Sequence, residues 1–219
     1  AAHQEAGYAQ PPPQAARARV VARPRTASDT PSSNASMYFS ILGERNSATT
    51  WVGKLFADNS APEVLQQVSL TEWKHDFVRD YDLGNFRWPL KRTLFVVCVK
   101  SPLAWAVSMY DSPFHSAMPE AMHRARSLAE FLAAPWRTNY SKSVRLKWHE
   151  EFTNVASFRT SKLRSHLLNG SSGSLVPGVN LHVVRYEDVL SDPRGSIEAL
   201  LAPYDVKFAR HEFLATTKK

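Results

Sequence analysis

Residues 37–51 constrain the fold more than any other part of the chain. The segment opens with a largely apolar run of aromatic and branched side chains, as in a buried β-strand, and Gly43 breaks that run. Glycine lets the backbone leave a sheet sharply and approach a ligand closely. A polar stretch then leads into an expected helix that contains Trp51, Leu55 and Phe56. The segment therefore predicts a strand, a loop and a helix in succession.

The loop before this helix has the composition of an anion-binding site. The first turn of a helix has unpaired N–H groups and the positive end of the helix dipole. Ser47, Thr49 and Thr50 add hydroxyl donors, and Arg45 adds a guanidinium group that suits phosphate or sulfate. A capped helix start without a ligand is the alternative. A Walker loop for ATP would need Gly-Lys-Ser/Thr at the helix entrance, where this chain has Ser47, Ala48 and Thr49.

Lys74 and His75 form a second candidate group, between the aromatic residues Trp73 and Phe77. A lysine can bind an anion and lower the pKa of a neighbouring imidazole, which leaves a neutral base at physiological pH. The alternative is an ordinary surface pair without a chemical role.

The run Thr93–Val99 is the clearest buried strand, and it contains the single cysteine, Cys98, which we expect to be an inert core residue. Lys100 follows, and Ser101 and Pro102 suit the N-cap and the first position of a helix.

Ligands of open parallel sheets lie at the carboxyl ends of the strands. Lys100 is therefore placed to neutralise a second phosphate, and Ser108, about two turns into the next helix, could donate to the same group. An ordinary helix-surface serine is the alternative. A further strand over residues 179–184 leads to Tyr186, which could stack on a base, and to Glu187, which we expect to pair with Arg45 or Arg185.

The segment 143–168 has apolar residues at near-helical spacing and predicts one or two helices. Three basic residues of this segment are expected on its exposed face: Arg159, Lys162 and Arg164. Three aromatic residues could line an acceptor pocket or belong to the core: Trp136, Tyr140 and Trp148.

Composition narrows the ligand class. The net charge is +7, but Lys and Arg are dispersed, which favours a small phosphorylated ligand over nucleic acid. The eight histidines show no metal-ligand spacing, so no metal is expected. No run of about twenty apolar residues is present, so a membrane contact would need an anchor outside this chain. Residues 1–36 are rich in Pro, Ala and Arg and predict a disordered basic arm or stem.

Four segments, in this order, resemble the sulfotransferase superfamily. They are Gly43-Glu44-Arg45-Asn46-Ser47-Ala48-Thr49-Thr50-Trp51; Lys74-His75; Lys100 with Ser108; and Arg185-Tyr186-Glu187-Asp188-Val189-Leu190 with Asp192-Pro193. The resemblance implies that the first segment holds the 5′-phosphosulfate of 3′-phosphoadenosine 5′-phosphosulfate (PAPS), and that Lys100 and Ser108 hold its 3′-phosphate. It also implies that His75 is the general base and that Lys74 stabilises charge on the transferred group. The implied PAPS contacts are Arg45, Asn46, Ser47, Ala48, Thr49, Thr50, Trp51, Lys100, Ser108 and Tyr186.

The sequence departs from the family pattern at three of these positions. Asn46 stands where the family usually has Lys or Arg, Ala48 stands where it has glycine, and Lys100 stands where Arg is commoner. The chain also ends soon after the last motif, so in the domain over 37–219 a C-terminal basic loop that some members have is expected to be absent or supplied only by Lys218 and Lys219. Weak PAPS affinity or a sequence truncated at its C-terminus would account for this.

Taken together, the sequence predicts one α/β domain with three α/β/α layers, a mostly parallel central sheet and a P-loop-like nucleotide-binding fold. The expected activity is transfer of a sulfuryl group from PAPS, without a metal, to a hydroxyl or amine of a small molecule or glycan. The alternatives are a catalytically silent nucleotide-binding or scaffold protein and, further off, a P-loop kinase. The basic arm and the acceptor sequons favour the Golgi lumen over the cytoplasm; the sequons begin at Asn34, Asn139 and Asn169.

Overall fold

A computed structural model describes residues 37–61, 64–71, 74–75, 77–78, 84–112, 125, 127–139, 149–167, 180–208 and 212–215. The chain divides into units over 1–31 and 32–219, and every described residue belongs to the second unit. The predicted arm over 1–36 lies outside the described residues and stays a prediction.

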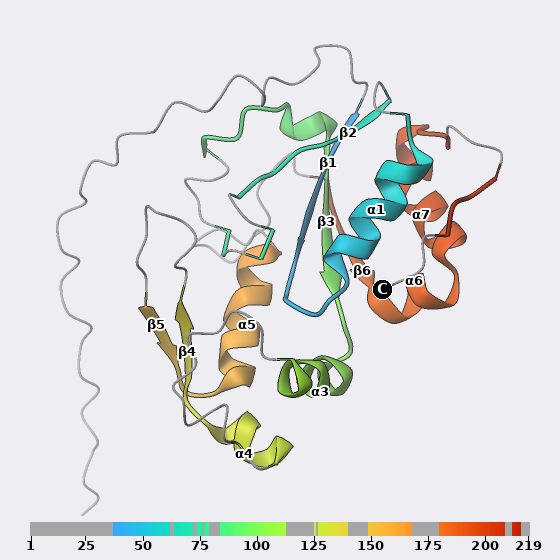
Figure 1. Ribbon diagram of the computed structural model, residues 1–219. Coiled ribbons are helices and arrows are strands. Elements are labelled where there is room, and N and C mark those ends of the chain that lie inside the picture. Colours follow the sequence, from blue (N-terminus) through green and yellow to red (C-terminus); the bar gives the residue numbers. More distant parts are fainter. Residues whose placement is uncertain are drawn as a thin grey trace, which may run out of the picture. The chain divides into compact units, whose positions relative to one another are not determined.

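Four strands form an open sheet in the order β2-β1-β3-β6 (Figure 1). Their bounds are Leu65–Gln67 for β2, Met37–Gly43 for β1, Thr93–Val99 for β3 and Asn180–Arg185 for β6. Every neighbouring pair is parallel. The prediction of a mixed α/β fold with a mostly parallel sheet is confirmed, and the strands expected around Gly43 and Cys98 lie where the sequence puts them.

Three helices pack against one face of this sheet: α1 (Thr49–Asn59), α6 (Tyr186–Ser191) and α7 (Pro193–Leu201). Strand residues of alternating position supply that face, among them Phe39 and Ile41 from β1 and Val96 from β3. Full burial of such a side chain contributes roughly 1.5–3 kcal/mol. This core fixes where α1 begins relative to the end of β1.

The opposite face of the sheet carries Leu42, Phe95 and Val97, which pack with Leu70 and Val78 from the segment between β2 and β3. Figure 1 shows α5 (Val155–His166) on the side of β1 away from α1. A 3₁₀ turn, Leu90–Arg92, leads into β3, and another, Ala202–Tyr204, follows α7.

A second, antiparallel pair of strands consists of β4 (Trp136–Asn139) and β5 (His149–Phe152). The helix predicted over 143–168 is therefore wrong for the residues of β5. The helix begins only at Val155, because Asn154 caps it: its Oδ1 accepts the Ser157 N–H at 2.9 Å, and its own N–H donates to Ser157 Oγ at 3.2 Å.

A separate apolar cluster joins α5 to α3 (Pro102–Asp111), α4 (Leu128–Ala133) and β4. Trp136 belongs to it: its ring stacks on Phe158 at 5.3 Å and meets Phe131 edge-on at 5.9 Å. Of the two roles predicted for Trp136, the structure therefore shows that of a core residue. Tyr140 and Trp148 lie outside the described residues.

In the part of the chain that the structure covers, no helix is long and apolar enough to cross a membrane.

Candidate functional site

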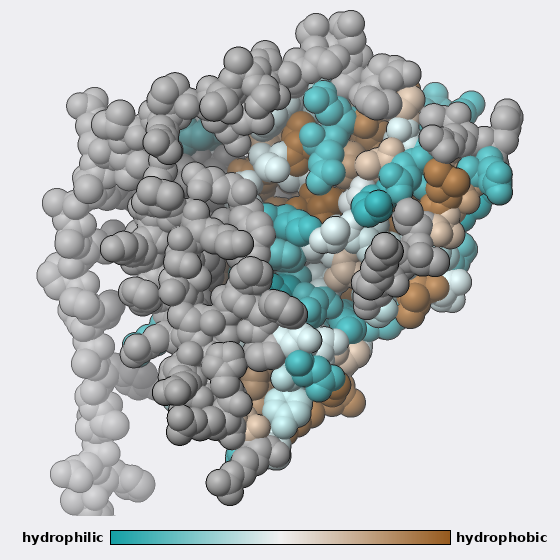
Figure 2. Space-filling view, in the orientation of Figure 1, coloured by the Kyte–Doolittle hydropathy of each residue, from teal (hydrophilic) through white to brown (hydrophobic). Residues whose placement is uncertain are grey.

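The candidate site lies where strands β1 and β3 end side by side. Gly43, the last residue of β1, is in register with Cys98 of β3, and Val99 is in register with Arg185 of β6. After β1 the chain continues to β2 on one side of the central pair, and after β3 it continues to β6 on the other side. The two connections therefore run in opposite directions from the central strands. Open parallel sheets bind ligands at such a switch point. Figure 2 shows hydrophilic residues over the loop between β1 and α1.

Gly43 is required because protein atoms crowd it on several sides. A Cβ at this position would lie 2.7 Å from the Cys98 carbonyl oxygen, 2.7 Å from Thr49 Cγ2 and 2.9 Å from Ser47 Oγ. The glycine thus allows the loop of residues 44–48 (the 44–48 loop) to fold back tightly over the end of β3.

Two residues of the 44–48 loop adopt left-handed backbone conformations. Asn46 has φ 60° and Ala48 has φ 64°. Asparagine tolerates this region, whereas alanine is strained in it. Ala48 is also the N-cap residue of α1 and has no side chain to cap the helix. Position 48, where the resemblance to sulfotransferases predicts glycine, therefore has a backbone conformation typical of glycine together with an alanine side chain.

Ser47 stabilises the 44–48 loop from within. Its hydroxyl donates to the Glu44 carbonyl oxygen at 2.6 Å, and its N–H donates to the same oxygen at 3.3 Å. The hydroxyl predicted to hold an anion is directed into the loop in this structure. The helix start offers backbone donors instead: Val52 N–H donates to the Ala48 carbonyl oxygen at 3.0 Å, and the N–H groups of Thr49 and Thr50 precede this bond in the first turn of α1.

Lys74 and His75 lie directly against this loop, as expected for parts of one site. Gly43 N–H donates to the Lys74 carbonyl oxygen at 3.2 Å, and His75 Nδ1 lies 2.9 Å from the Gly43 carbonyl oxygen. Lys74 Nζ donates to Thr50 Oγ1 at 2.6 Å, at the first turn of α1. The structure therefore brings the predicted base, its neighbouring cation and the loop together.

The imidazole of His75 is neutral at physiological pH, as predicted, but chiefly for another reason. Burial lowers its pKa to about 3, and the positive charges of Lys74, Lys162 and Arg45 lower it further, while the hydrogen bond to Gly43 opposes the shift. Because a carbonyl oxygen can only accept, Nδ1 carries the proton and the lone pair is on Nε2. Burial also lowers the pKa of Lys74.

Lys100 and Ser108, the two residues predicted to bind a 3′-phosphate, are in contact. Lys100 Nζ donates to Ser108 Oγ at 2.6 Å. The ammonium also lies 5.0 Å from the centre of the Tyr186 ring, which meets the Trp51 ring edge-on at 6.2 Å. A residue directly after β3 thus meets residues of α3, α6 and α1, and each of these residues was a candidate from sequence.

Asn46 links the two halves of the site. Its Nδ2 donates to the Ser108 carbonyl oxygen at 3.1 Å and lies 3.3 Å from Met109 Sδ and 3.4 Å from the Ser112 carbonyl oxygen. At the position where the resemblance to sulfotransferases predicts a cation, this chain therefore has an amide that bonds the 44–48 loop to α3.

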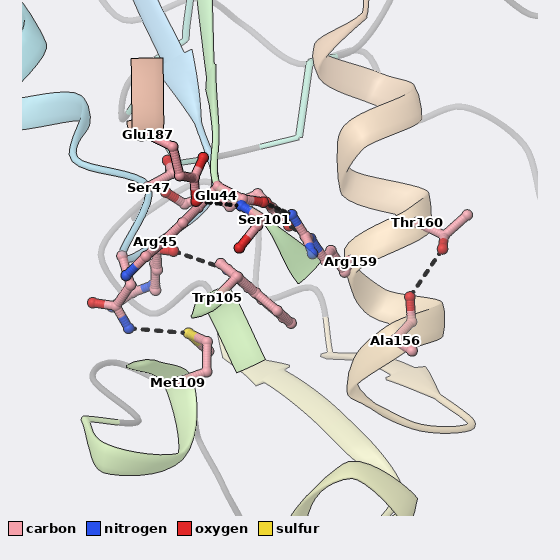
Figure 3. A network of polar contacts seen from close by, with 12 residues as sticks. Glu44, Arg45, Ser47, Ser101, Trp105, Met109, Ala156, Arg159, Thr160 and Glu187 are labelled. Atoms are coloured by element: carbon pink, nitrogen blue, oxygen red, sulfur yellow. Dashed lines mark hydrogen bonds and ion pairs between the residues drawn. The ribbon is translucent and has the colours of Figure 1, made fainter. Parts of the chain in front are cut away.

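A buried ion pair between Glu44 and Arg159, which no local sequence pattern indicates, lies next to the loop (Figure 3). Arg159 Nε lies 2.8 Å and 3.1 Å from the two carboxylate oxygens of Glu44, and Arg159 Nη2 donates to the Lys100 carbonyl oxygen at 2.5 Å. The prediction that Arg159 and Lys162 are exposed is wrong, since only 9% and 3% of these residues is accessible. Burial raises the pKa of Glu44 to about 7, although the charges of Arg159 and Lys162 lower it.

Ser101 occupies the predicted N-cap position of α3, but its side chain makes no capping bond. Its N–H donates to Glu187 Oε1 at 2.9 Å. Burial alone would raise the pKa of Glu187, but this bond and the charge of Arg185 hold it below its usual value. The Glu187 carboxylate therefore joins the start of α6 to the start of α3.

No group of three or more His, Cys, Asp or Glu side chains suited to a metal ion occurs among the described residues. No protein-family model matches the chain, and a comparison with curated proteins finds no match.

Proposed function

We propose that this protein is a sulfotransferase that moves a sulfuryl group from PAPS to a hydroxyl or amine acceptor, on a three-layer fold of the P-loop-like kind. The observation that carries the proposal is the bond of 2.6 Å between Lys100 Nζ and Ser108 Oγ. It sets a cation and a hydroxyl beside the end of β3, while the 44–48 loop and His75 lie beside the end of β1. A ligand with a phosphate at each end suits such a site better than a nucleotide with one phosphate chain.

The residues present have the chemistry to hold PAPS. At its 5′ end the donors would be the backbone N–H groups at the start of α1 and the Lys74 ammonium, with Arg45 as a further cation. At its 3′ end they would be Lys100 and Ser108, with the Tyr186 ring against the base. PAPS would supply the sulfuryl group: the acceptor oxygen or nitrogen would bond to sulfur, the bond from sulfur to the 5′-phosphate oxygen would break, and adenosine 3′,5′-bisphosphate would leave.

His75 would remove the proton of the acceptor at Nε2, because Nδ1 donates to Gly43. The bond to Gly43 orients the ring, and Lys74 would donate to the oxygen on which charge develops. A pKa of about 3 makes the imidazole a weak base in this state. Two anionic groups bound nearby favour the imidazolium, so a bound donor would raise that pKa toward the working pH.

A catalytically silent nucleotide-binding protein is the second candidate. Two observations favour it: the Asn46 amide is bonded to α3 where the family has a cation, and the pKa of His75 is far below neutrality. Both candidates share the nucleotide site and differ only in turnover. The acceptor class proposed is a small molecule or glycan, with the Golgi lumen favoured as the compartment.

Thermal unfolding with nucleotides tests the site. At a hundred times its Kd a ligand stabilises the native state by about 2.7 kcal/mol, or roughly 5–10 °C in Tm for a domain of this size. Adenosine 3′,5′-bisphosphate should give such a shift, and ATP a much smaller one. Lys100→Met with Ser108→Ala should remove the difference, whereas Lys54→Met, at an exposed site on α1, should keep it. Equal shifts from both nucleotides in the native protein would refute the two-ended site.

Turnover separates the enzyme from the binder. The native protein is incubated with labelled PAPS and a panel of glycans, phenols, steroids and amines, and transfer of label is measured. His75→Gln should keep the Tm shift from the bisphosphate and lose transfer. If the native protein binds the bisphosphate but transfers to no member of the panel, the silent binder is the better conclusion.

A further inference from the structure

Arg159 on α5 makes contact with both halves of the site through different parts of one guanidinium group. Its Nε lies within hydrogen-bond distance of both Glu44 carboxylate oxygens, and its Nη2 donates to the Lys100 carbonyl oxygen at 2.5 Å. Glu44 opens the 44–48 loop, and Lys100 carries the ammonium that contacts Ser108. Figure 3 shows the side chain pointing from α5 toward the ends of the strands.

Trp105 adds a second path from Arg159 to the same loop. The guanidinium carbon lies 4.8 Å from the centre of the Trp105 ring, and Trp105 Nε1 donates to the Arg45 carbonyl oxygen at 3.0 Å. Trp105 is buried on α3, the helix that carries Ser108. Arg159 is thus in contact with one residue at the end of each central strand and with the helix that carries Ser108.

This arrangement does more than attach α5 to the sheet. Apolar side chains of similar volume would attach the helix as well, because replacing a buried ion pair by hydrophobic residues is often neutral for stability. Only a planar group with several fixed donors can hold the Glu44 carboxylate and the Lys100 carbonyl oxygen at a set separation. A lysine side chain has the same charge but lacks this planar set of fixed donors.

We propose that Arg159 is a positioning residue that sets the distance between the 44–48 loop and the Lys100–Ser108 pair, so that one ligand can engage both ends at once. The inference rests on the proposed function, because it requires a ligand with two anionic ends. When both ends of a ligand bind together, the second contact is intramolecular, and affinity depends steeply on whether the geometry permits both. An error of about 1 Å in such positioning can cost about a hundredfold in rate.

The test measures three ligands by isothermal titration calorimetry in the native protein and in Arg159→Lys. Adenosine 5′-monophosphate probes the loop half, adenosine 3′-monophosphate probes the Lys100–Ser108 half, and adenosine 3′,5′-bisphosphate probes both together. The two-ended advantage is the Kd of the tighter monophosphate divided by the Kd of the bisphosphate. We expect Arg159→Lys to lower this advantage about tenfold and to leave both monophosphate Kd values within about twofold.

The control is Arg164→Lys, because Arg164 is an exposed arginine on the same helix, and this variant should keep the full advantage. An unchanged advantage in Arg159→Lys would overturn the inference. So would an equal rise of all three Kd values, which is the result of a merely structural role. If the native protein shows no two-ended advantage, the proposed function itself fails.

Trp105→Phe provides the test if Arg159→Lys does not fold. The ring over the guanidinium is kept, and the Nε1–H bond to the Arg45 carbonyl oxygen is lost. The advantage should fall while each monophosphate binds as before. An advantage equal to that of the native protein would overturn the inference here too.

Discussion

Replacing Ala48 by glycine should stabilise the protein, although glycine weakens most helices. Ala48 has φ 64° and ψ 22° at the N-cap of α1. A left-handed conformation costs an L-residue roughly 1–2 kcal/mol, and glycine does not incur this cost. Glycine also suits an N-cap better than alanine does. The larger conformational freedom of glycine in the unfolded chain opposes these gains by roughly 0.5–1 kcal/mol. The net increase in the free energy of unfolding should be about 1 kcal/mol.

Urea unfolding followed by circular dichroism measures this change. The midpoint should rise with no change in the m-value, because the surface exposed on unfolding stays the same. Ala57→Gly is the matched control, since Ala57 is an exposed residue within the same helix, where glycine should cost about 1 kcal/mol. The two substitutions should thus shift the midpoint in opposite directions. A fall or no change in Ala48→Gly would refute the argument that the loop backbone is strained there.

Three further predictions concern neighbouring residues. Because burial lowers the folded pKa of His75 to about 3, its contribution to the free energy of unfolding is complete above pH 6.5 and falls by about 2 kcal/mol toward pH 5. His75→Gln should lose that slope in urea titrations at several pH values, and an unchanged slope would contradict the assigned pKa. Asn46→Lys, which introduces the cation expected from the resemblance to sulfotransferases, should lower stability by about 1–2 kcal/mol through the lost bond to α3 and should not lower the Kd for the bisphosphate; tighter binding would argue otherwise. The buried Cys98 thiol, whose pKa burial raises to about 12, should react with iodoacetamide at pH 8 only after unfolding, and rapid labelling of the native protein would exclude a core position.

The strands and the start of α1 could be predicted because their signals are local. The apolar run of β3 is bounded by charged residues before it and by Lys100 and Pro102 after it, and the observed strand has the predicted bounds. The contact between Lys100 and Ser108 could also be predicted from sequence, because a strand end followed by a helix brings these two positions close.

The remaining features depend on partners distant in the sequence. The segment 143–168, which contains β5, has apolar side chains at near-helical spacing, yet the residues of β5 pair with the strand β4 earlier in the chain. No local pattern indicates this pairing. Arg159 looks like a surface cation until its partner is known, and Glu44 lies 115 residues away in the chain. Charged residues are rarely buried without a partner, so pattern alone assigns them to the surface.

The two backbone hydrogen bonds of Gly43 affect how the protein moves. Its N–H donates to Lys74, and the His75 ring is bonded to its carbonyl oxygen, so both polar atoms of one residue are engaged by the same two-residue segment. Neither the segment nor the end of β1 can move away without breaking both bonds. In native-state hydrogen exchange the Gly43 amide should therefore open together with residues 74–75 as one cooperative unit. Such an opening would release the imidazole and the loop in the same event.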